Sequence, residues 1–357
     1  MDQRSTALAH WVAQILVPDS DMSVSNAAGP IELNMVSGDA SFRRYFRVQL
    51  HGRSWMAVDA PTDTENNPAF VAIAKHWADH GIQVPQIVAY DFEQGFLLQQ
   101  DFGDALFWQQ LHQDDISEPE INRYYRQAID ELLKIQALPL TDLPSYDGVL
   151  LDQEMALFRD WLCTQYLQLE LDESEQKVLT QAFELLKQNA LQQPQVVVHR
   201  DYHSRNLMVK TDGSLGVIDF QDAVIGAASY DLVSLLRDCY VRWPATMIDD
   251  LAGYYWELAR PKGIYHGDWQ QFQQDFDWMG LQRHLKAAGI FARLWLRDGK
   301  SGYLKDIPNT VQYLVDISAK YSQLSEFHQW LNNRFLPALQ VKQADLSTPT
   351  TVDAQCV

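Results

Sequence analysis

Cysteines, cations and long apolar runs are all scarce in this sequence. The three cysteines, Cys163, Cys239 and Cys356, are far apart and form no CxxC pair. They therefore predict neither a disulfide framework nor a zinc site, and they fit a reducing cytoplasm. No apolar run approaches the ~18 residues of a membrane-spanning helix, and the N-terminus lacks the regions of a signal peptide. We expect a cytoplasmic protein that has no membrane partner.

Positive charge is scarce as well, with 28 Lys and Arg against 47 Asp and Glu and a formal net charge of -19. A surface of this sign repels phosphate backbones and anionic lipids, so we expect no nucleic-acid partner. Of the 357 residues, 46% are hydrophobic, which is enough to build a sizeable core. The length suits one two-lobed protein or two modest domains.

The N-terminal region, up to residue 103, contains mostly strand signals. Residues 44–50 and 54–59 are rich in aromatic and branched side chains and flank a short turn, which predicts an antiparallel hairpin. Apolar residues at helical spacing predict a helix from Asn67 to His80. Two shorter strands are predicted at 84–88 and 96–98.

The remainder of the chain is mainly helical in pattern. Helical periodicity covers 105–190 and continues from 229 to about 339, and a β-rich island at 196–220 separates the two stretches. Residues 343–357 are polar and without periodicity, so we predict disorder there. We predict an α+β fold with a strand-rich, nucleotide-binding N-lobe at 1–103, a connector near 99–104 and a helical, catalytic C-lobe at 104–342.

The β-rich island combines a hairpin signal with polar residues. Asp212-Gly213 between two apolar runs predicts a hairpin turn, and the expected register places Asn206 opposite Asp219. An amide oxygen and a carboxylate would then converge where the hairpin opens. Such hard oxygen ligands suit Mg²⁺ together with phosphates and water.

Asp201 stands five residues before Asn206, on the loop that leads into the hairpin. A carboxylate there can orient and deprotonate a hydroxyl group beside metal-bound phosphates, which is what phosphoryl transfer requires. Each piece alone is common in ordinary turns, but together they predict an ATP- and Mg²⁺-dependent kinase. Only eleven residues separate Asp219 from Asp231, which leaves no room for a peptide-binding platform and favours a small acceptor.

The motifs H-R-D-Y-H-S-R-N at 199–206 and V-I-D-F at 217–220 resemble the catalytic loop and the metal-binding segment of the aminoglycoside-phosphotransferase-like family. The resemblance implies a two-lobed protein-kinase-like fold with ATP and Mg²⁺ as cofactors. It implies that Asp201 is the catalytic residue and that Asn206 and Asp219 hold the metal. By the same resemblance, Asp231 is structural.

The nucleotide-binding residues depart from the family pattern. The strand that usually ends V-A-I-K reads Met56-Ala57-Val58-Asp59, and Phe70 stands where the family has a helix glutamate, so the Lys–Glu pair is absent. We hypothesise that Arg43 or Arg44 contacts the phosphates instead. The other predicted ATP-binding residues are Gly38, Asp39 and Ser41 in a loop over the phosphates, and Gln99, Gln100, Asp101 and Phe102 in the adenine connector.

Several segments resemble one subgroup of the family, the anomeric kinases of N-acetylmuramate and N-acetylglucosamine in cell-wall recycling. They are residues 38–47, 56–61, 100–104, 154–161, 199–208 and 280–291. The resemblance implies phosphorylation of the anomeric hydroxyl of an N-acetylated amino sugar. For acceptor binding it suggests Arg205, Arg283 or Lys286 toward the muramate carboxylate, Glu154 or Asp222 toward sugar hydroxyls, and His203 more as a brace of the loop than as a base.

Two other functions stay open. An aminoglycoside, choline or homoserine-type kinase would need carboxylates for a cationic acceptor, which the net charge allows. A pseudokinase that binds nucleotide as a scaffold would explain the missing Lys–Glu pair. Glu154, Phe158 and Trp161 have the spacing of one helix face, so the two aromatic residues could be core, and Arg283-His284 could be an exposed pair on an amphipathic helix.

Overall fold

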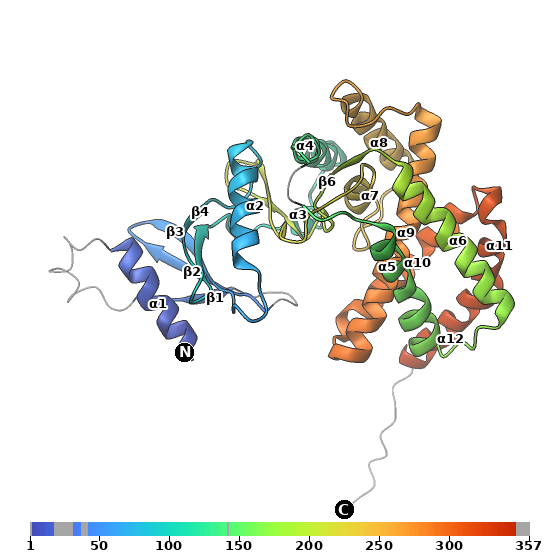
Figure 1. Ribbon diagram of the computed structural model, residues 1–357, viewed down its shortest axis with the longest axis horizontal. Coiled ribbons are helices and arrows are strands. Elements are labelled where there is room, and N and C mark those ends of the chain that lie inside the picture. The colour runs from blue at the N-terminus through green and yellow to red at the C-terminus, as the bar shows by residue number, and fades with distance from the viewer. Residues whose placement is uncertain (1, 18–30, 37–41, 141–142, 348–357) are drawn as a thin grey trace, which may run out of the picture. The chain divides into compact units, whose positions relative to one another are not determined.

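The structure of the protein is a computed structural model that describes residues 2–17, 31–36, 42–140 and 143–347. The described chain folds into two compact units (Figure 1). The first unit contains residues up to 138 together with 204–223, and the second contains 139–203 and the residues from 224 onward. None of the helices in the described ranges is long and apolar enough to span a membrane.

The first unit begins with an antiparallel sheet and two helices. These elements are α1 (Gln3–Leu16), β1 (Asn34–Val36), β2 (Arg44–Leu50), β3 (Arg53–Asp59), α2 (Asn67–Asp79), β4 (Ile87–Asp91) and β5 (Phe96–Gln100). The strands lie in the order β1-β2-β3-β5-β4, and the hairpin of β2 and β3 pairs Arg44 with Asp59 at its open end. Helix α1 packs on this sheet, where its Leu8 and Val12 are fully buried against Phe46.

The rest of the first unit comprises α3 (Phe107–Gln110), α4 (Glu118–Gln136) and a hairpin of β7 (Leu207–Val209) and β8 (Leu215–Val217). Gly216 in β8 lets this hairpin approach the segment after β5, because a Cβ atom there would lie 2.4 Å from the Phe102 ring. The amide of Val217 also donates to the carbonyl of Gln83 at 2.7 Å. The hairpin is thus fixed to the strand-rich part of its unit.

The second unit is mainly helical around a small sheet in which β6 (Gln195–Val198) pairs with β9 (Val224–Ala227). Its helices are α5 (Gly148–Leu157), the π-helix η2 (Phe158–Tyr166), α6 (Glu173–Gln192), α7 (Tyr230–Leu236), α8 (Ala245–Ala259), α9 (Trp269–Asp298), the 3₁₀ turn η3 (Ser301–Asp306), α10 (Ile307–Ser318), the 3₁₀ turn η4 (Ser322–Leu324), α11 (Ser325–Trp330), the π-helix η5 (Leu331–Phe335) and α12 (Leu336–Ser347). Helix α9 packs against α5, α6, α7 and α10, and so forms the centre of the unit. Phe158 is fully buried, which confirms its interpretation as a core residue.

The α+β prediction is confirmed, with the main sheet in the first unit and most helices in the second. The sequence signals did not predict α1 or β1. Helix α12 continues to Ser347, so the prediction of disorder is wrong for 343–347, while 348–357 lie outside the described residues. The compact units do not follow the lobe boundaries either, since 104–138 and 204–223 belong to the strand-rich unit. The functional lobes therefore stay a prediction.

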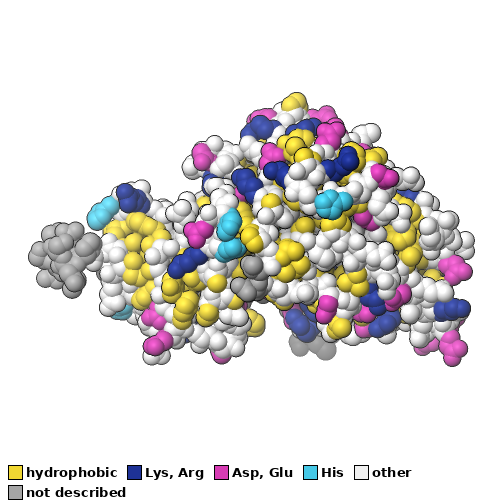
Figure 2. Space-filling view, turned by 45° about the horizontal axis from the view of Figure 1, so that its top comes forward, with side chains coloured by type: hydrophobic (Ala, Val, Ile, Leu, Met, Phe, Trp, Pro, Cys, Tyr) yellow, Lys and Arg dark blue, Asp and Glu magenta, His cyan; other side chains and the backbone are white. Residues whose placement is uncertain are grey.

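The face of the molecule drawn in Figure 2 shows acidic and basic side chains interspersed with apolar ones, without a large area of one sign. A large basic area is the usual footprint of nucleic-acid binding. This face therefore offers no such footprint, in line with the acidic composition.

Candidate active site

The hairpin of β7 and β8 carries the two expected metal ligands, but its register differs from the prediction. The strands pair over a loop of residues 211–213, in which Gly213 takes a left-handed φ of 77°. A loop with an odd number of residues shifts the pairing by one position. Asn206 therefore lies opposite Ile218, whose amide donates to its carbonyl at 3.1 Å, and the predicted pairing with Asp219 is wrong.

Asn206 and Asp219 nevertheless meet, because Asp219 leaves the ladder with a φ of 65°. The Nδ2 atom of Asn206 lies 3.3 Å from Oδ2 of Asp219, and Nε2 of Gln221 donates to Oδ1 of Asp219 at 2.7 Å. A non-glycine residue in the left-handed region is strained by about 1–3 kcal/mol, which is typical of functional sites. Within the described ranges no three His, Cys, Asp or Glu residues surround a common centre. A metal here would take two protein oxygens and add phosphate and water, a donor set that fits Mg²⁺.

Asp201 lies in the second unit, on the loop after β6. Its amide donates to Nδ1 of His199 at 3.2 Å. Burial disfavours the carboxylate anion, but neighbouring positive charge, that of Lys286 above all, outweighs burial and holds the pKa of Asp201 below its usual value. The side chain is therefore ionised at neutral pH and can accept a hydrogen bond or a proton from a hydroxyl group.

Asp231 holds the backbone just before Asp201. Its carboxylate accepts the amide hydrogens of His199 at 2.6 Å and of Arg200 at 3.0 Å. Burial raises the pKa of Asp231 to about 7, although both hydrogen bonds favour its anion. Because the side chain is fully buried, it supports the loop and does not face a substrate.

Glu154, at the C-terminal part of α5, lies in a buried polar cluster of the second unit and is only 7% exposed. Its Oε1 atom accepts hydrogen bonds from Arg200 at 2.7 Å and makes an ion pair with Lys286 at 3.2 Å. Its Oε2 atom accepts from the Tyr146 hydroxyl and lies 3.5 Å from Nε2 of Gln282. Burial opposes ionisation of the carboxyl, but the two cations outweigh it and hold the pKa of Glu154 low.

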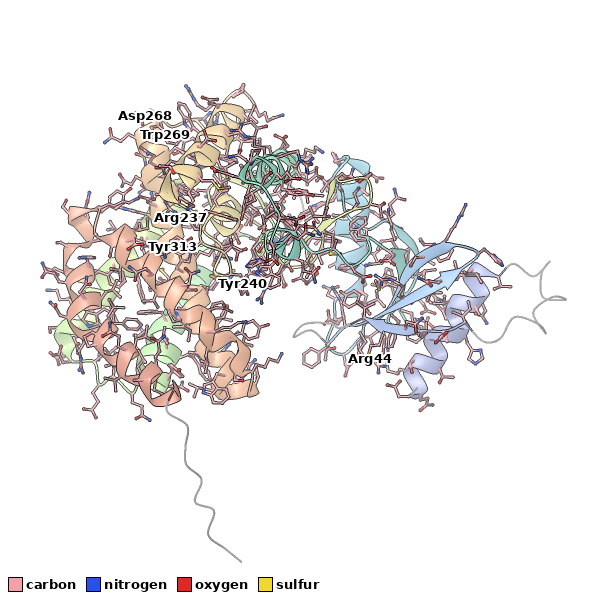
Figure 3. The ribbon with its side chains drawn as sticks, turned by 180° about the vertical axis from the view of Figure 1, so that it is seen from behind. Arg44, Arg237, Tyr240, Asp268, Trp269 and Tyr313 are labelled. Carbon is pink, nitrogen blue, oxygen red and sulfur yellow. The ribbon has the colours of Figure 1, made fainter. Side chains whose placement is uncertain are left out.

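His203 and Arg283 also belong to the second unit. The ring of Tyr240, which is labelled in Figure 3, is met edge-on by the ring of His203 at 5.5 Å. Burial lowers the pKa of His203, so its ring is neutral at pH 7. Arg283 is buried and donates to Sγ of Cys239 at 3.5 Å, and its neighbour His284 is fully buried. The alternative of an exposed Arg283-His284 pair is therefore wrong, because α9 runs through the centre of its unit.

Arg205 and Asp222 lie in the first unit. The Arg205 guanidinium lies over the ring of Trp108 at 5.4 Å, which fixes a cation near the start of the hairpin. The side chain of Asp222 is exposed just beyond the hairpin. The Asp222 carboxylate is therefore accessible from solvent.

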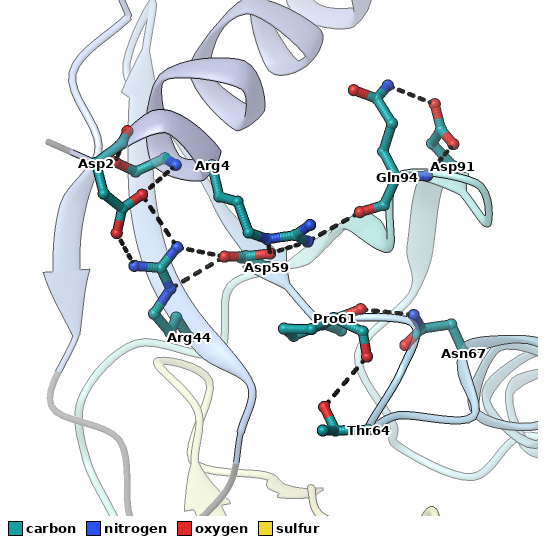
Figure 4. A network of polar contacts seen from close by, with 11 residues as sticks. Asp2, Arg4, Arg44, Asp59, Pro61, Thr64, Asn67, Asp91 and Gln94 are labelled. Atoms are coloured by element: carbon teal, nitrogen blue, oxygen red, sulfur yellow. Dashed lines mark hydrogen bonds and ion pairs between the residues drawn. The ribbon is translucent and has the colours of Figure 1, made fainter.

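Asp59 occupies the position where the resemblance led us to expect a lysine, and it is fully buried between two arginines (Figure 4). Its Oδ1 atom accepts from Nε of Arg4 at 2.9 Å, and its Oδ2 atom accepts from Nε of Arg44 at 3.0 Å. Arg44 also pairs with Asp2, the residue that caps α1. The cluster ties α1 to β2 and β3.

Arg43 has different surroundings from its neighbour. Its side chain is buried, with Nε 3.0 Å from Oε2 of Glu65 and the guanidinium 4.4 Å from the ring centre of Phe70. Phe70 stacks in turn on Phe220 at 5.0 Å, and Phe220 directly follows the proposed metal ligand Asp219. An Arg–Glu ion pair thus stands beside the position where the helix glutamate was expected.

The connector residues lie at and after the end of β5. Asp101 accepts hydrogen bonds from Nε of Arg47 at 2.6 Å and from Oγ of Ser54 at 2.5 Å, so its side chain is bound to the sheet. Gln99 is buried, and its Oε1 atom has no hydrogen-bond partner in the part of the chain that the structure describes. Gln100 is exposed, and the Phe102 ring packs on β8. The predicted phosphate-loop residues Gly38, Asp39 and Ser41 lie outside the described residues.

Sequence reasoning missed the residues that hold the predicted ones in place. Arg4, Glu65 and Tyr146 lie far from the motifs in the chain and carry no local signal. Arg200 lies inside the motif at 199–206, and its position next to Asp201 was a signal that could have been used.

Comparison with known proteins identifies the family of this chain. Residues 32–264, more than half of the chain, match the model of the phosphotransferase enzyme family. An N-acetylmuramate/N-acetylglucosamine kinase of Pseudomonas putida is 41% identical over 91% of this chain and 95% of its own length. One of Neisseria meningitidis is 37% identical over 92% and 95%. An ethanolamine kinase structure of Plasmodium vivax aligns with a TM-score of 0.59 at 12% identity, over 87% of this chain and 86% of that one, which supports the fold alone. The chain belongs to the phosphotransferase enzyme family.

Proposed function

We propose that this protein transfers the γ-phosphoryl group of ATP to the anomeric hydroxyl of N-acetylmuramate or N-acetylglucosamine, as a step of cell-wall recycling in the cytoplasm. The observation that carries the proposal is an ionised carboxylate at Asp201, five residues before an Asn206–Asp219 pair that suits Mg²⁺. The two curated relatives named as kinases of these sugars support the choice of acceptor.

The transfer is a displacement at the γ-phosphorus. The anomeric oxygen forms a bond to phosphorus, the bond from phosphorus to the bridging oxygen breaks, and ADP leaves with that electron pair. The hydroxyl proton passes to the carboxylate of Asp201. Because neighbouring cations hold the pKa of Asp201 low, it is a weak base, which orients the hydroxyl early and takes the proton once the new bond makes that proton acidic.

Asn206 and Asp219 would hold Mg²⁺, which neutralises phosphate charge when it is bound. In the structure the amide nitrogen of Asn206 faces Asp219, so the amide group would turn over to present its oxygen. The hydrogen bond from Gln221 fixes the other oxygen of Asp219 and orients the carboxylate.

The acceptor requires recognition of hydroxyls and, in muramate, of a carboxylate. We assign the carboxylate to the cations Arg205 or Arg283, since guanidinium groups bind carboxylates through paired hydrogen bonds. Asp222 is an exposed acceptor for sugar hydroxyls. His203 is held against Tyr240 and neutral, which suits a brace or a hydrogen-bonding partner and not a base.

For the ATP phosphates, the surroundings favour Arg43 over Arg44. Arg44 is shared between Asp59 and Asp2, whereas Arg43 and Glu65 form a pair of the kind that Lys and Glu form in other kinases. Gly38, Asp39 and Ser41 remain the proposed phosphate loop. The backbone from Gln99 to Phe102 would hold the adenine, and an amino group of the base would satisfy the buried Oε1 atom of Gln99.

The first test is ADP release with Mg-ATP across an acceptor panel of N-acetylmuramate, N-acetylglucosamine, other hexoses, kanamycin, choline and no acceptor. Stimulation confined to the N-acetylated sugars, with a 1-phosphate product, is expected. Stimulation by kanamycin or choline would keep the kinase chemistry and overturn the acceptor. For a kinase, Asp201→Asn should reduce turnover by orders of magnitude and keep nucleotide binding, whereas a nucleotide-binding scaffold would lose nothing.

Arg43 and Arg44 provide a matched pair for the phosphate assignment. Arg43→Ala should raise the KM for ATP, while Arg44→Ala should lower stability and leave that KM unchanged. The assignment is wrong if the KM for ATP does not respond to Arg43→Ala.

A further inference from the structure

The loop that carries the proposed catalytic residue contains a strained residue directly before it. Arg200 has a φ of 75°, in the left-handed region that side-chain-bearing residues avoid. Such a conformation costs about 1–3 kcal/mol and persists only when its surroundings fix it from several sides. Asp231 fixes the backbone by accepting the amide hydrogens of His199 and Arg200. A second restraint acts on the Arg200 side chain.

That second restraint is Glu154. Its Oε1 atom binds Arg200 at 2.7 Å and Lys286 at 3.2 Å, while its Oε2 atom accepts from Tyr146 and lies near the Gln282 amide. Both oxygens of a side chain that is only 7% exposed are thus engaged by protein groups. This geometry favours a role inside the protein over the sugar contact that the sequence suggested for Glu154.

The cluster also has a definite charge balance. One carboxylate, Glu154, lies between two cations, and Lys286 donates in addition to the Tyr230 hydroxyl at 3.0 Å. A buried carboxylate shared by two cations holds both of them at fixed positions, and removing it would leave Arg200 without its ion-pair partner. Glu154 therefore sets the position of Arg200 and of Lys286 together.

Regulated protein kinases order their catalytic region when a phosphate on the activation segment pairs with arginine. This chain has only eleven residues between Asp219 and Asp231, so it lacks such a segment. Its arginine next to the catalytic carboxylate is bound instead by a glutamate that is built into α5. We propose that Glu154 is a positioning residue that clamps Arg200, and through it the Asp201 loop, in the active arrangement without any covalent modification.

The inference builds on the proposed kinase reaction and is tested by Glu154→Gln, which keeps the shape and removes the charge. We expect kcat to fall roughly 100-fold, as a displacement of about 1 Å at a catalytic group can cause, with the KM values for ATP and sugar unchanged. Glu154→Asp, which keeps the charge, should recover part of kcat. Glu184→Gln is the matched control, because Glu184 pairs with Lys187 at 2.7 Å on the exposed face of α6 and should not change kcat.

The kinetic outcomes separate the two roles of Glu154. A rise in the KM for sugar with kcat preserved would make Glu154 a sugar contact and overturn the proposal, as would unchanged kinetics. The double variant Glu154→Gln/Arg200→Gln removes one charge of each sign, which relieves the uncompensated cation if the single variant is unstable. If Glu154 positions Arg200, kcat should stay low in the double variant even if its melting temperature rises back to that of the unmodified chain. If kcat recovers together with stability, the cluster has only a structural role and the proposal is wrong.

Hydrogen exchange supplies a readout that does not depend on the acceptor. In Glu154→Gln the amides of residues 199–203 should exchange faster than in the unmodified chain, whichever sugar proves to be the substrate. If the acceptor panel fails but exchange rises at this loop, the proposed reaction falls and the clamp stands. If exchange does not change, the clamp is refuted while the reaction is untouched.

Discussion

The sharpest stability test concerns Asp59, which replaces the lysine of the family pattern. Changing Asp59 to Asn keeps the size of the side chain and removes the buried negative charge that Arg4 and Arg44 share (Figure 4). Changing it to Lys restores the residue of other kinases but places a third cation in the cluster. We therefore expect Asp59→Lys, which restores the family motif, to lower the stability of this protein more than Asp59→Asn does.

The size of the effect follows from the surroundings of the carboxylate. Breaking a buried ion pair costs about 3–5 kcal/mol, because the partner charge is left without compensation. Arg4 and Arg44 are 43% and 30% exposed, so water can relieve part of this loss and the lower end applies to Asp59→Asn. About 3 kcal/mol corresponds to a drop of about 6–12 °C in the melting temperature of a unit of this size. Asp59→Lys should exceed that drop.

The assay is thermal unfolding followed by calorimetry and tryptophan fluorescence, with Asp316→Asn as the control. Asp316 also pairs with an arginine, Arg242, but the two side chains are 42% and 37% exposed, so its loss should cost only about 0–1 kcal/mol. Equal melting temperatures for Asp59→Asn and the control would refute the view that a buried ion cluster ties α1 to the sheet. Unchanged stability of Asp59→Lys with tighter ATP binding would show that the position still accepts the family lysine.

Three further outcomes can be checked. Gly289→Ala would bring a Cβ atom within 2.3 Å of the backbone of Leu157, the last residue of α5, and should lower the free energy of unfolding by roughly 1–3 kcal/mol. Gly302→Ala, with open space around it, should be neutral in chemical denaturation. Because Lys286 is the strongest cation acting to lower the pKa of Asp201, kcat should stay flat down to the acid side of the ordinary carboxyl range, and Lys286→Met should move the acid limb of its pH profile to higher pH. Asn206→Ala should raise the Mg²⁺ concentration needed for half-maximal activity, measured by metal titration at fixed ATP.

The approach of Asn206 to Asp219, the pair proposed to hold the metal, could be predicted from the sequence although the strand register could not. Asn206 and Asp219 flank the open end of a short hairpin, and in the observed register they come together because Asp219 leaves the ladder with a φ of 65°. The register itself depends on whether the turn contains two or three residues. That choice depends on the backbone angle of Gly213. The alternation of apolar and polar residues in such short strands does not reveal this angle.

The roles of Arg43 and Arg44 could not be separated from the sequence either. Successive side chains along an extended chain point to opposite faces, so two adjacent arginines reach different partners. One reaches Glu65 and Phe70, and the other reaches Asp59 and Asp2. These partners lie on other elements, and only the folded sheet brings them together. The same holds for Glu154, whose cationic partners come from the loop after β6 and from α9.

The first unit includes residues 204–223, which the chain reaches only after it has formed part of the second unit, and this order has a consequence for synthesis on the ribosome. Residues 1–138 emerge first, but the first unit also needs the hairpin segment 204–223. Until that segment is made, the Phe70 ring lacks Phe220 and the Phe102 ring lacks the surface of Gly216. The strand-rich unit therefore cannot complete its folding while residues 139–203 are translated, and some of its apolar side chains stay exposed during that time. A chaperone that binds exposed apolar side chains would act mainly in this interval.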